Sequence, residues 1–482
     1  MSLSQVGFPK ELQNAIDYSL PANVNSYSVK VVPSNLSQVQ STTQTLTASS
    51  TLNLLGTSTN IIFDIPAGQG KGIFIDPRFS TINFRANYEV VAAGSAAVTT
   101  SACLRGCGMS HFDRTYTQSQ SGVILDDINL VGVVQDQLNA LEIDVAAKDA
   151  LAMMYGFQYE AGAANSQNNV QGHIIKNLDN IASGNLANGS SYYSYSMPLL
   201  NSLIGKGAGK FFQIGATSKL QVVLQTAAIL PITMITGSAT TAATARVTLD
   251  NISINLQYVD IGAEGVKMLD KTGLQYYNGI TYRASTATLP STSGAVSLLT
   301  GLRGSSVRNI VTRCCEAADT STTYCVNYLY DSKMPQATSI SYNVNGLQVP
   351  PNPVDLLHAP ASAYSFLQEA NASFNQYEFK SGLAPDRYCV YVSGGTLDTA
   401  ADARITSSAT TAYNQSQWAF GYNMEKVSKA GILDGANLNS GNTFLNMVLG
   451  NASTKTLTFI FIAKMDIIYI LDTANGELSV RI

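Results

Sequence analysis

Two segments with alternating apolar residues constrain the fold of this chain more than any other feature. Within residues 219–224, Leu220, Val222 and Leu224 alternate with the residues between them. Residues 246–259 keep the same period of two, with a slip of one position at Asn251. Side chains two positions apart share one face of a β-strand, and a one-residue slip inside a strong strand indicates a β-bulge. We interpret these segments as the closing strands of a β domain.

Further strand candidates are distributed along both halves of the chain. In the first half they are 61–65, 72–75, 81–91, 111–117 and 122–130, and in the second half 275–282, 306–313, 323–330, 339–347, 417–422 and 457–471. Helical spacing of apolar residues predicts helices at 134–154 and 361–370, the second after a proline-rich break at 350–353. This pattern predicts an all-β fold of two tandem jelly-roll β-sandwiches with short helical excursions.

The second half repeats the landmarks of the first at similar spacing. Residues 339–347 are the predicted counterpart of 123–130, because each precedes a helical excursion and, later, a closing strand. We therefore expect a first jelly roll at 28–262 and a second at 263–482. Residues 1–27 are expected to form an N-terminal arm that orders only by docking, because its one helical stretch is short.

The composition limits the classes of function. Charged residues make up 12% of the 482 residues, roughly half the usual share of about 25%, and the net charge is −4. No block of like charge is present, which argues against a dedicated nucleic-acid surface. Small uncharged groups lose little on desolvation, so such surfaces suit a chain that packs against copies of itself. An ordinary secreted β-protein is the alternative explanation of the composition.

The sequence predicts neither a signal peptide nor a membrane-spanning segment. The N-terminal residues lack a cationic region followed by an apolar core, and the most apolar run, 457–471, contains Lys464 and Asp466. Six cysteines are therefore expected to be thiols, namely Cys103, Cys107, Cys314, Cys315, Cys325 and Cys389. Cys314 and Cys315 would point to opposite faces of a strand, so at most one is expected to face a core.

A glycine-rich loop, Gly205 to Lys210, resembles a phosphate-binding loop only superficially. That motif needs four residues between its first glycine and the Gly-Lys pair, followed by Ser or Thr. Here three residues precede Gly209, and Phe211 follows the lysine. Because a strand rather than a helix is predicted next, we interpret the loop as a turn.

No constellation in the sequence predicts catalysis or metal binding. Cys103, Cys107 and His111 have the spacing of zinc ligands, but no fourth ligand is evident nearby. None of the histidines, His111, His173 and His358, occurs in a catalytic motif. Asp126 and Asp127 are adjacent, so on a strand they face opposite ways. We predict no catalytic, cofactor-binding or metal-binding residue and no cofactor, and we expect the single tryptophan, Trp418, to lie in a core.

Several segments together resemble one family. In the first half they are Met197-Pro198-Leu199-Leu200, the strand at 219–226 and Tyr258-Val259-Asp260, and in the second half Asn343-Val344-Asn345-Gly346-Leu347-Gln348-Val349-Pro350, Phe420-Gly421-Tyr422-Asn423-Met424-Glu425-Lys426 and Leu438-Asn439-Ser440-Gly441-Asn442-Thr443. Their order and spacing are similar to those of the double jelly-roll major capsid proteins of small icosahedral double-stranded DNA viruses. That lineage includes virophages, polinton-like viruses and adenovirus-type hexons.

The resemblance implies a structural protein rather than an enzyme. It implies homotrimeric, pseudo-hexagonal capsomers in a virion shell that is assembled inside the host cell. The implied partners are other copies of the chain, penton and minor capsid proteins, and an internal membrane or cement protein beneath the shell. It implies no sequence-specific contact with nucleic acid. The alternative is a virion spike or lectin-like jelly-roll protein that binds host glycans, and an enzyme on a β-sandwich is a third possibility.

Overall fold

The computed structural model describes most of the two sandwich regions. The described residues are 38–46, 50–53, 58–66, 70–91, 102–104, 106–156, 174–175, 191–228, 232–234, 244–260, 273–291, 293–316, 328–330, 332–372, 383, 388–389, 417–425, 435–439, 441–450 and 456–481. The predicted arm at 1–27 and all but Gly273 of the predicted junction at 262–273 lie outside them, so the predicted domain boundaries stay a prediction.

The first sandwich consists of two antiparallel sheets. One sheet contains, in spatial order, β1 (Gln38–Leu46), β12 (Thr244–Asp260), β4 (Ile73–Val91) and β9 (Ser191–Pro198), with β2 (Ser50–Asn53) also paired to β12. The other contains β3 (Asn60–Ile65), β10 (Leu220–Thr226), β6 (Phe112–Ser119) and β7 (Ile124–Asn129). A small third sheet contains β11 (Ile232–Met234), β5 (Ala102–Leu104) and β8 (Ile174–Ile175).

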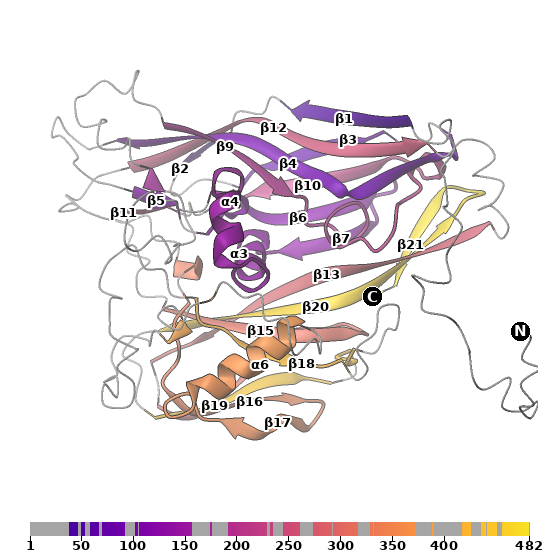
Figure 1. Cartoon of the computed structure of the whole chain (residues 1–482). Coiled ribbons are helices and arrows are strands. Elements are labelled where there is room, and N and C mark those ends of the chain that lie inside the picture. The colour runs from indigo at the N-terminus through magenta and orange to yellow at the C-terminus, as the bar shows by residue number, and fades with distance from the viewer. Residues whose placement is uncertain are drawn as a thin grey trace, which may run out of the picture.

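The second sandwich has the same construction. One sheet contains β13 (Leu274–Leu289), β20 (Leu457–Asp472), β15 (Val307–Glu316) and β18 (Phe420–Asn423), with β21 (Glu477–Arg481) also paired to β20. The other contains β14 (Gly294–Leu299), β19 (Thr443–Leu449), β16 (Ala337–Val344) and β17 (Leu347–Val354). Figure 1 shows the strands of the first sandwich above those of the second, with β13 and β20 as the strands of the second sandwich nearest to the first.

The two sandwiches share one topology. Numbered along the chain, the main strands of each sandwich are arranged 1-8-3-6 in one sheet and 2-7-4-5 in the other. This is the arrangement of a jelly roll. Helices follow the fifth strand in both halves, namely α3 (Val131–Glu142) and α4 (Val145–Tyr155) after β7, and α6 (Pro360–Ala372) after β17. The predicted double jelly roll with helical excursions is therefore confirmed.

The segments with the strongest apolar patterns form the predicted strands. The segments at 219–224, 246–259 and 457–471 are β10, β12 and β20. The pairing of β12 with β4 shifts between Asp250 and Ser253, and Asn251 has a φ of 51°. The predicted bulge at Asn251 is therefore confirmed.

Several predicted boundaries were wrong. The helix at 134–154 is two helices, because Asp144 accepts a hydrogen bond from the Ala147 amide (2.6 Å) and caps a new start. The strands at 72–75 and 81–91 are one strand, β4, which bulges between Asp76 and Thr81. Of the predicted strand at 323–330, only 328–330 are described, and they form the 3₁₀ turn η6 (Tyr328–Tyr330).

The predicted counterpart of 123–130 was also placed one strand too early. Residues 339–347 cross the hairpin from β16 to β17, where Asn345 and Gly346 have positive φ values of 53° and 86°. An Asn-Gly pair in this conformation forms a tight hairpin turn. The true counterpart of β7 is β17, so the prolines at 350–353 lie inside a strand rather than in a break. Proline is tolerated there because β17 is the edge of its sheet.

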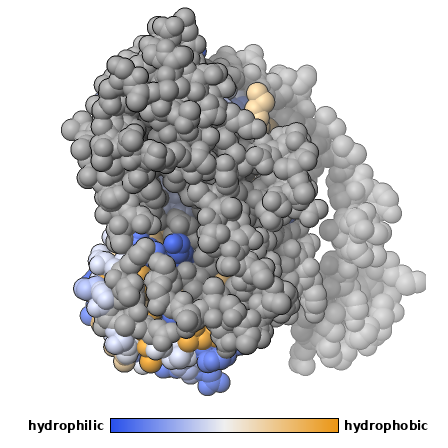
Figure 2. Space-filling view, turned by 90° about the vertical axis from the view of Figure 1, so that its left-hand side faces the viewer, coloured by the Kyte–Doolittle hydropathy of each residue, from blue (hydrophilic) through white to orange (hydrophobic). Residues whose placement is uncertain are grey.

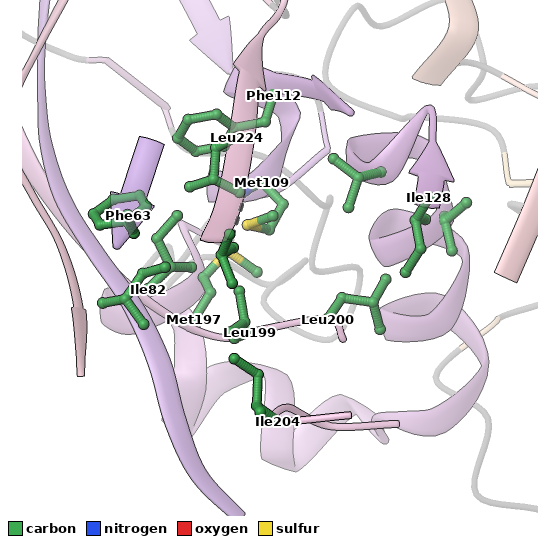
Figure 3. Packing of buried hydrophobic residues seen from close by; sticks show 14 of the residues in the cluster. Phe63, Ile82, Met109, Phe112, Ile128, Met197, Leu199, Leu200, Ile204 and Leu224 are labelled. Carbon is green, nitrogen blue, oxygen red and sulfur yellow. Dashed lines mark hydrogen bonds between the residues drawn. The ribbon is translucent and has the colours of Figure 1, made fainter. Parts of the chain in front are cut away.

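The buried apolar residues form two cores, which are separated by the sheet that contains β15 and β20. In the first core, Met109 and Met197 lie at the centre of the packed side chains, and the Met109 amide donates a hydrogen bond to the Met197 sulfur (3.2 Å; Figure 3). The second core surrounds Trp418, which is fully buried as predicted.

The strand β20 contributes to both cores. Phe459, Phe461 and Met465 belong to the second core, whereas Ile467 and Tyr469 belong to the first. Ile460 and Ile462, which alternate with Phe459 and Phe461, also belong to the first core, so the first sandwich packs directly onto the opposite face of this strand.

The neighbouring cysteines of β15 are divided between the cores in the same way. Cys314 belongs to the second core and Cys315 to the first, and both are buried. The expectation that at most one faces a core was wrong, because both faces of β15 are covered. Cys107, Cys314, Cys315 and Cys389 are free thiols, while the side chains of Cys103 and Cys325 lie outside the described part. None of the described helices is long and apolar enough to cross a membrane.

The left-handed backbone of Asn251 gives a first prediction. Asn251 is exposed, so its substitution changes the backbone energy without removing core contacts. We expect Asn251→Val to destabilise the fold by about 1–2 kcal/mol, because a β-branched residue is strained at positive φ. Thermal unfolding of this variant should be compared with that of Asn251→Gly, which tolerates the conformation. Equal stability of the two variants would contradict the bulge.

Candidate functional site

The contact between the sandwiches is the most specific arrangement of polar groups in the described residues. We call it the seam. It joins β7, α3 and residues 199–210 of the first sandwich to β13, β15 and β20 of the second. In Figure 1, β7 and β13 lie next to one another at this level.

Asp126 is the polar centre of the seam. Its Oδ2 accepts hydrogen bonds from the amide and the hydroxyl of Ser202 (2.8 and 2.5 Å), and its Oδ1 accepts one from the Thr281 hydroxyl (2.6 Å). The Tyr469 hydroxyl lies 2.5 Å from the Ser202 hydroxyl oxygen. Since Ser202 donates its proton to Asp126, Tyr469 donates to Ser202. Burial, together with the charge of Asp126, raises the pKa of Tyr469 well above its ordinary value, so this donor stays protonated.

The glycine loop, Gly205 to Lys210, contributes backbone hydrogen bonds to the seam. The Gly209 amide donates to the Asn278 carbonyl (3.0 Å), and the Ile280 amide donates to the Gly207 carbonyl (2.7 Å). A Cβ at Gly207 would lie 2.1 Å from the Ile280 carbonyl oxygen, so only glycine fits there. The amides of residues 206–208 donate to carbonyl oxygens of 199, 201 and 205, and so they cannot cradle a phosphate. The loop is a turn, as predicted. Its packing against the second sandwich was not predicted.

A fully buried ion pair crosses the seam further along. Arg313 of β15 and Asp136 of α3 are joined by Nη1 and Oδ2 at 2.8 Å, and both side chains are 1% exposed. Within the described part of the chain, Nε and Nη2 of Arg313 have no hydrogen-bond partner. Desolvation offsets much of the attraction in such a pair, so it contributes more to the specificity of the contact than to its stability.

Aromatic contacts and exposed ion pairs surround these groups. The rings of Phe212 and Tyr277 meet edge to face with their centroids 5.2 Å apart. Lys206 pairs with Glu142 at 2.7 Å on the exposed rim. Exposed pairs contribute little, at most about 1 kcal/mol, so the seam depends mainly on its buried groups.

A pocket of about 340 Å³ opens beside the glycine loop, with Arg78, Ser80 and Lys206 in its wall. Arg78 is already paired with Asp76 at 2.6 Å, and its hydrogen bonds lower the pKa of that carboxyl. Lys206 is already paired with Glu142. The pocket thus contains two cations neutralised by the chain's own carboxylates and no nucleophile paired with a base.

The other residues considered in the sequence have structural contacts. His111 is buried, with Nδ1 2.7 Å from the Gly108 carbonyl oxygen and its ring against Phe84 and Tyr195. Among the described residues, no group of three His, Cys, Asp or Glu could hold a metal ion. The exposed His358 pairs with Asp355, and His173 lies outside the described residues.

The prediction that Asp126 and Asp127 face opposite ways is confirmed. Asp126 is buried in the seam, whereas Asp127 pairs with Arg114 at 2.7 Å and also lies 3.9 Å from Arg283 of β13. Sequence reasoning missed the role of Asp126, because its partners are far away along the chain.

Comparisons with known proteins place the fold. No protein-family profile matches the sequence, and no curated protein sequence matches it. The cryo-EM structure of the Sputnik virophage contains a chain that is 12% identical with a TM-score of 0.55, over 97% of this chain and 93% of that one. The crystal structure of the mavirus major capsid protein is 12% identical with a TM-score of 0.51, over 96% and 94%. A chain of the PBCV-1 virus capsid is 9% identical with a TM-score of 0.51, over 93% and 98%. At these identities the similarity establishes a shared double jelly-roll fold over nearly the whole chain.

The buried ion pair gives a second prediction. Asp136→Ala would leave Arg313 as an uncompensated buried cation, so we expect a loss of about 3–5 kcal/mol in the free energy of unfolding. Trp418 is the single tryptophan and lies in the second core, so its fluorescence during urea unfolding reports on that sandwich. The double variant Asp136→Leu, Arg313→Met removes both charges and should recover most of the loss. Asp64→Ala is the control, because Asp64 and its partner Lys219 are both exposed. An equal effect of the two Asp→Ala variants would contradict the buried pair.

Burial of His111 gives a pH prediction. Desolvation lowers its pKa from 6.5 to about 4, and the Gly108 carbonyl only partly opposes this. Between these values the unfolded chain binds more protons than the folded chain, so stability present above pH 6.5 is lost as the pH falls toward 4. The loss should be about 3 kcal/mol. His111→Phe should flatten the dependence of the unfolding midpoint on pH in this window, whereas the exposed His358→Gln should not. An unchanged slope in His111→Phe would rule out this assignment.

Proposed function

We propose that this chain is the structural major capsid protein of an icosahedral double-stranded DNA virus. The observation that carries the proposal is the duplication of one jelly roll into two sandwiches that a buried seam holds in one relative placement. The similarity in fold to chains of the Sputnik virophage, the mavirus major capsid protein and the PBCV-1 capsid supports it. The role is structural rather than enzymatic, and the place of the chain is the virion shell.

In this proposal three chains form one capsomer. Two sandwiches per chain give six sandwiches in a ring, so a trimer occupies a nearly hexagonal site in the shell. The ring closes by a cyclic, heterologous contact in which the first sandwich of one copy meets the second sandwich of the next. The seam supports this geometry because it fixes the angle between the sandwiches by packing.

The same proposal defines the partners. Neighbouring capsomers, penton proteins and minor capsid proteins contact the outer flanks, and an internal membrane or cement protein lies beneath the shell. The arm at 1–27, which lies outside the described residues, ties the subunit to a neighbour or a minor protein. The glycan-binding alternative has no support from Trp418, because that side chain is buried.

The trimer is directly testable. Light scattering of the purified protein after size-exclusion chromatography should report about three times 51.2 kDa. Contacts of this class typically bury about 2,000 Å² or more, so the trimer should persist on dilution until the chains unfold. Electron microscopy of the same sample should show particles with a pseudo-hexagonal outline. A stable monomer at micromolar concentration would falsify the proposed capsomer.

A further inference from the structure

The seam provides a pattern for contacts between copies. Within one chain, the edge strand β7 of the first sandwich lies against the edge strand β13 of the second. These are the fifth strand of one jelly roll and the first strand of the next. The contact is made by side chains, such as Asp126 with Thr281, because β7 and β13 form no strand ladder.

The second sandwich presents the equivalent edge unpaired. Its fifth strand, β17, pairs with β16 on one side and with no strand of the described residues on the other. Leu347 is the most exposed leucine of the described residues, at 69%. Gln348, Pro351, Asn352 and Pro353 are also exposed. This edge, Leu347–Val354, therefore meets solvent in the single chain.

The chemistry of the β17 edge differs from that of an ordinary surface strand. None of the four strands β14, β16, β17 and β19 contains a charged residue, whereas β3, β6 and β7 of the equivalent sheet contain Asp64, Asp113, Arg114, Asp126 and Asp127. The pairing of β17 with β16 passes from Tyr342↔Val349 to Ile340↔Val354, so residues 350–353 bulge away from the ladder. Prolines there lack amide donors, which discourages the addition of another strand. The edge instead presents apolar side chains and carbonyl oxygens to a partner.

We propose that the β17 edge of one copy packs against the β1 edge of the first sandwich of a second copy. The occupant follows from topology: β1 is the first strand of its jelly roll, as β13 is, and among the described residues it pairs only with β12. The rotation and translation that relate the first sandwich to the second then also relate the second sandwich to the first sandwich of the next chain. This inference rests on the proposed trimer and identifies its interface.

The opposite edge of the same sheet serves as a reference. Leu299 of β14 is 51% exposed, and β14 contains no charged residue. The corresponding strand of the first sandwich, β3, makes no comparable contact with the second sandwich among the described residues. The proposed contact between copies, which repeats the seam, therefore includes Leu347 and does not include Leu299.

The experiment compares Leu347→Glu with Leu299→Glu. Both replace an exposed leucine by the same charge on one sheet, so thermal unfolding monitored by circular dichroism should stay close to wild type in both. Sedimentation velocity across a dilution series should show that Leu347→Glu dissociates at concentrations where the wild type stays trimeric, because a charge is then desolvated in the contact. Leu299→Glu should assemble like wild type.

The outcomes separate this inference from the capsomer itself. A trimeric wild type with two equally trimeric variants overturns the β17 contact and leaves the capsomer intact. A monomeric wild type overturns the capsomer. As a second measurement that needs no destabilising change, the photoreactive residue p-benzoylphenylalanine at position 347 should cross-link to residues 38–46 of another copy. Cross-links confined to other segments, in a trimeric sample, also overturn the β17 contact.

Discussion

The placement of the two sandwiches depends on a sheet whose strands β15 and β20 belong to both hydrophobic cores. All 16 residues of β20 pair with β13, and the two faces of the strand contribute to different cores. Phe459 and Phe461 fill the second core, whereas Ile460 and Ile462 on the opposite face, and Tyr469 further along, fill the first. Apolar burial is the main favourable term in folding. The same term that folds the second sandwich therefore also attaches the first, and the covalent junction need only be long enough.

Apolar packing alone would allow the two sandwiches to slide, and the buried polar groups of the seam remove that freedom. Asp126 needs donors because an unpaired buried carboxylate is very costly. Ser202 of its own sandwich and Thr281 of the other supply them together in one arrangement only. Arg313 and Asp136 impose a second such condition at another point of the contact. Two separate sets of buried polar contacts fix both the position and the rotation of one sandwich relative to the other. A subunit of a regular ring requires such a fixed arrangement.

The sequence predicted the elements whose signal is local and missed those whose cause lies elsewhere in the chain. The alternation in β10 and β12 and the slip at Asn251 are local, and so the strands and the bulge were found. The helix break at Asp144 is local too, but a capping aspartate within an apolar periodicity is easily read as a surface residue. The seam was not predictable, because Ser202 meets Asp126 across 76 positions and Tyr469 across 267. A single sequence gives no signal for pairings at that separation. Even the glycines of the loop identify a turn and not the neighbouring carbonyl that excludes a side chain.

The chemistry of the equivalent edges fits a contact made permanently within the chain and one made only on assembly. The β7 edge contains Asp126, whose buried charge is acceptable because its partner strand is always present at high effective concentration. An edge that must stay soluble until it meets another chain cannot bury such a charge in advance, and it must also resist pairing with the wrong strand. The β17 edge has neither a charge nor a regular ladder, and prolines occupy its bulge. In the proposed capsomer, the aspartate of β7 would serve a contact formed on folding, and the proline-rich bulge of β17 a contact formed on assembly.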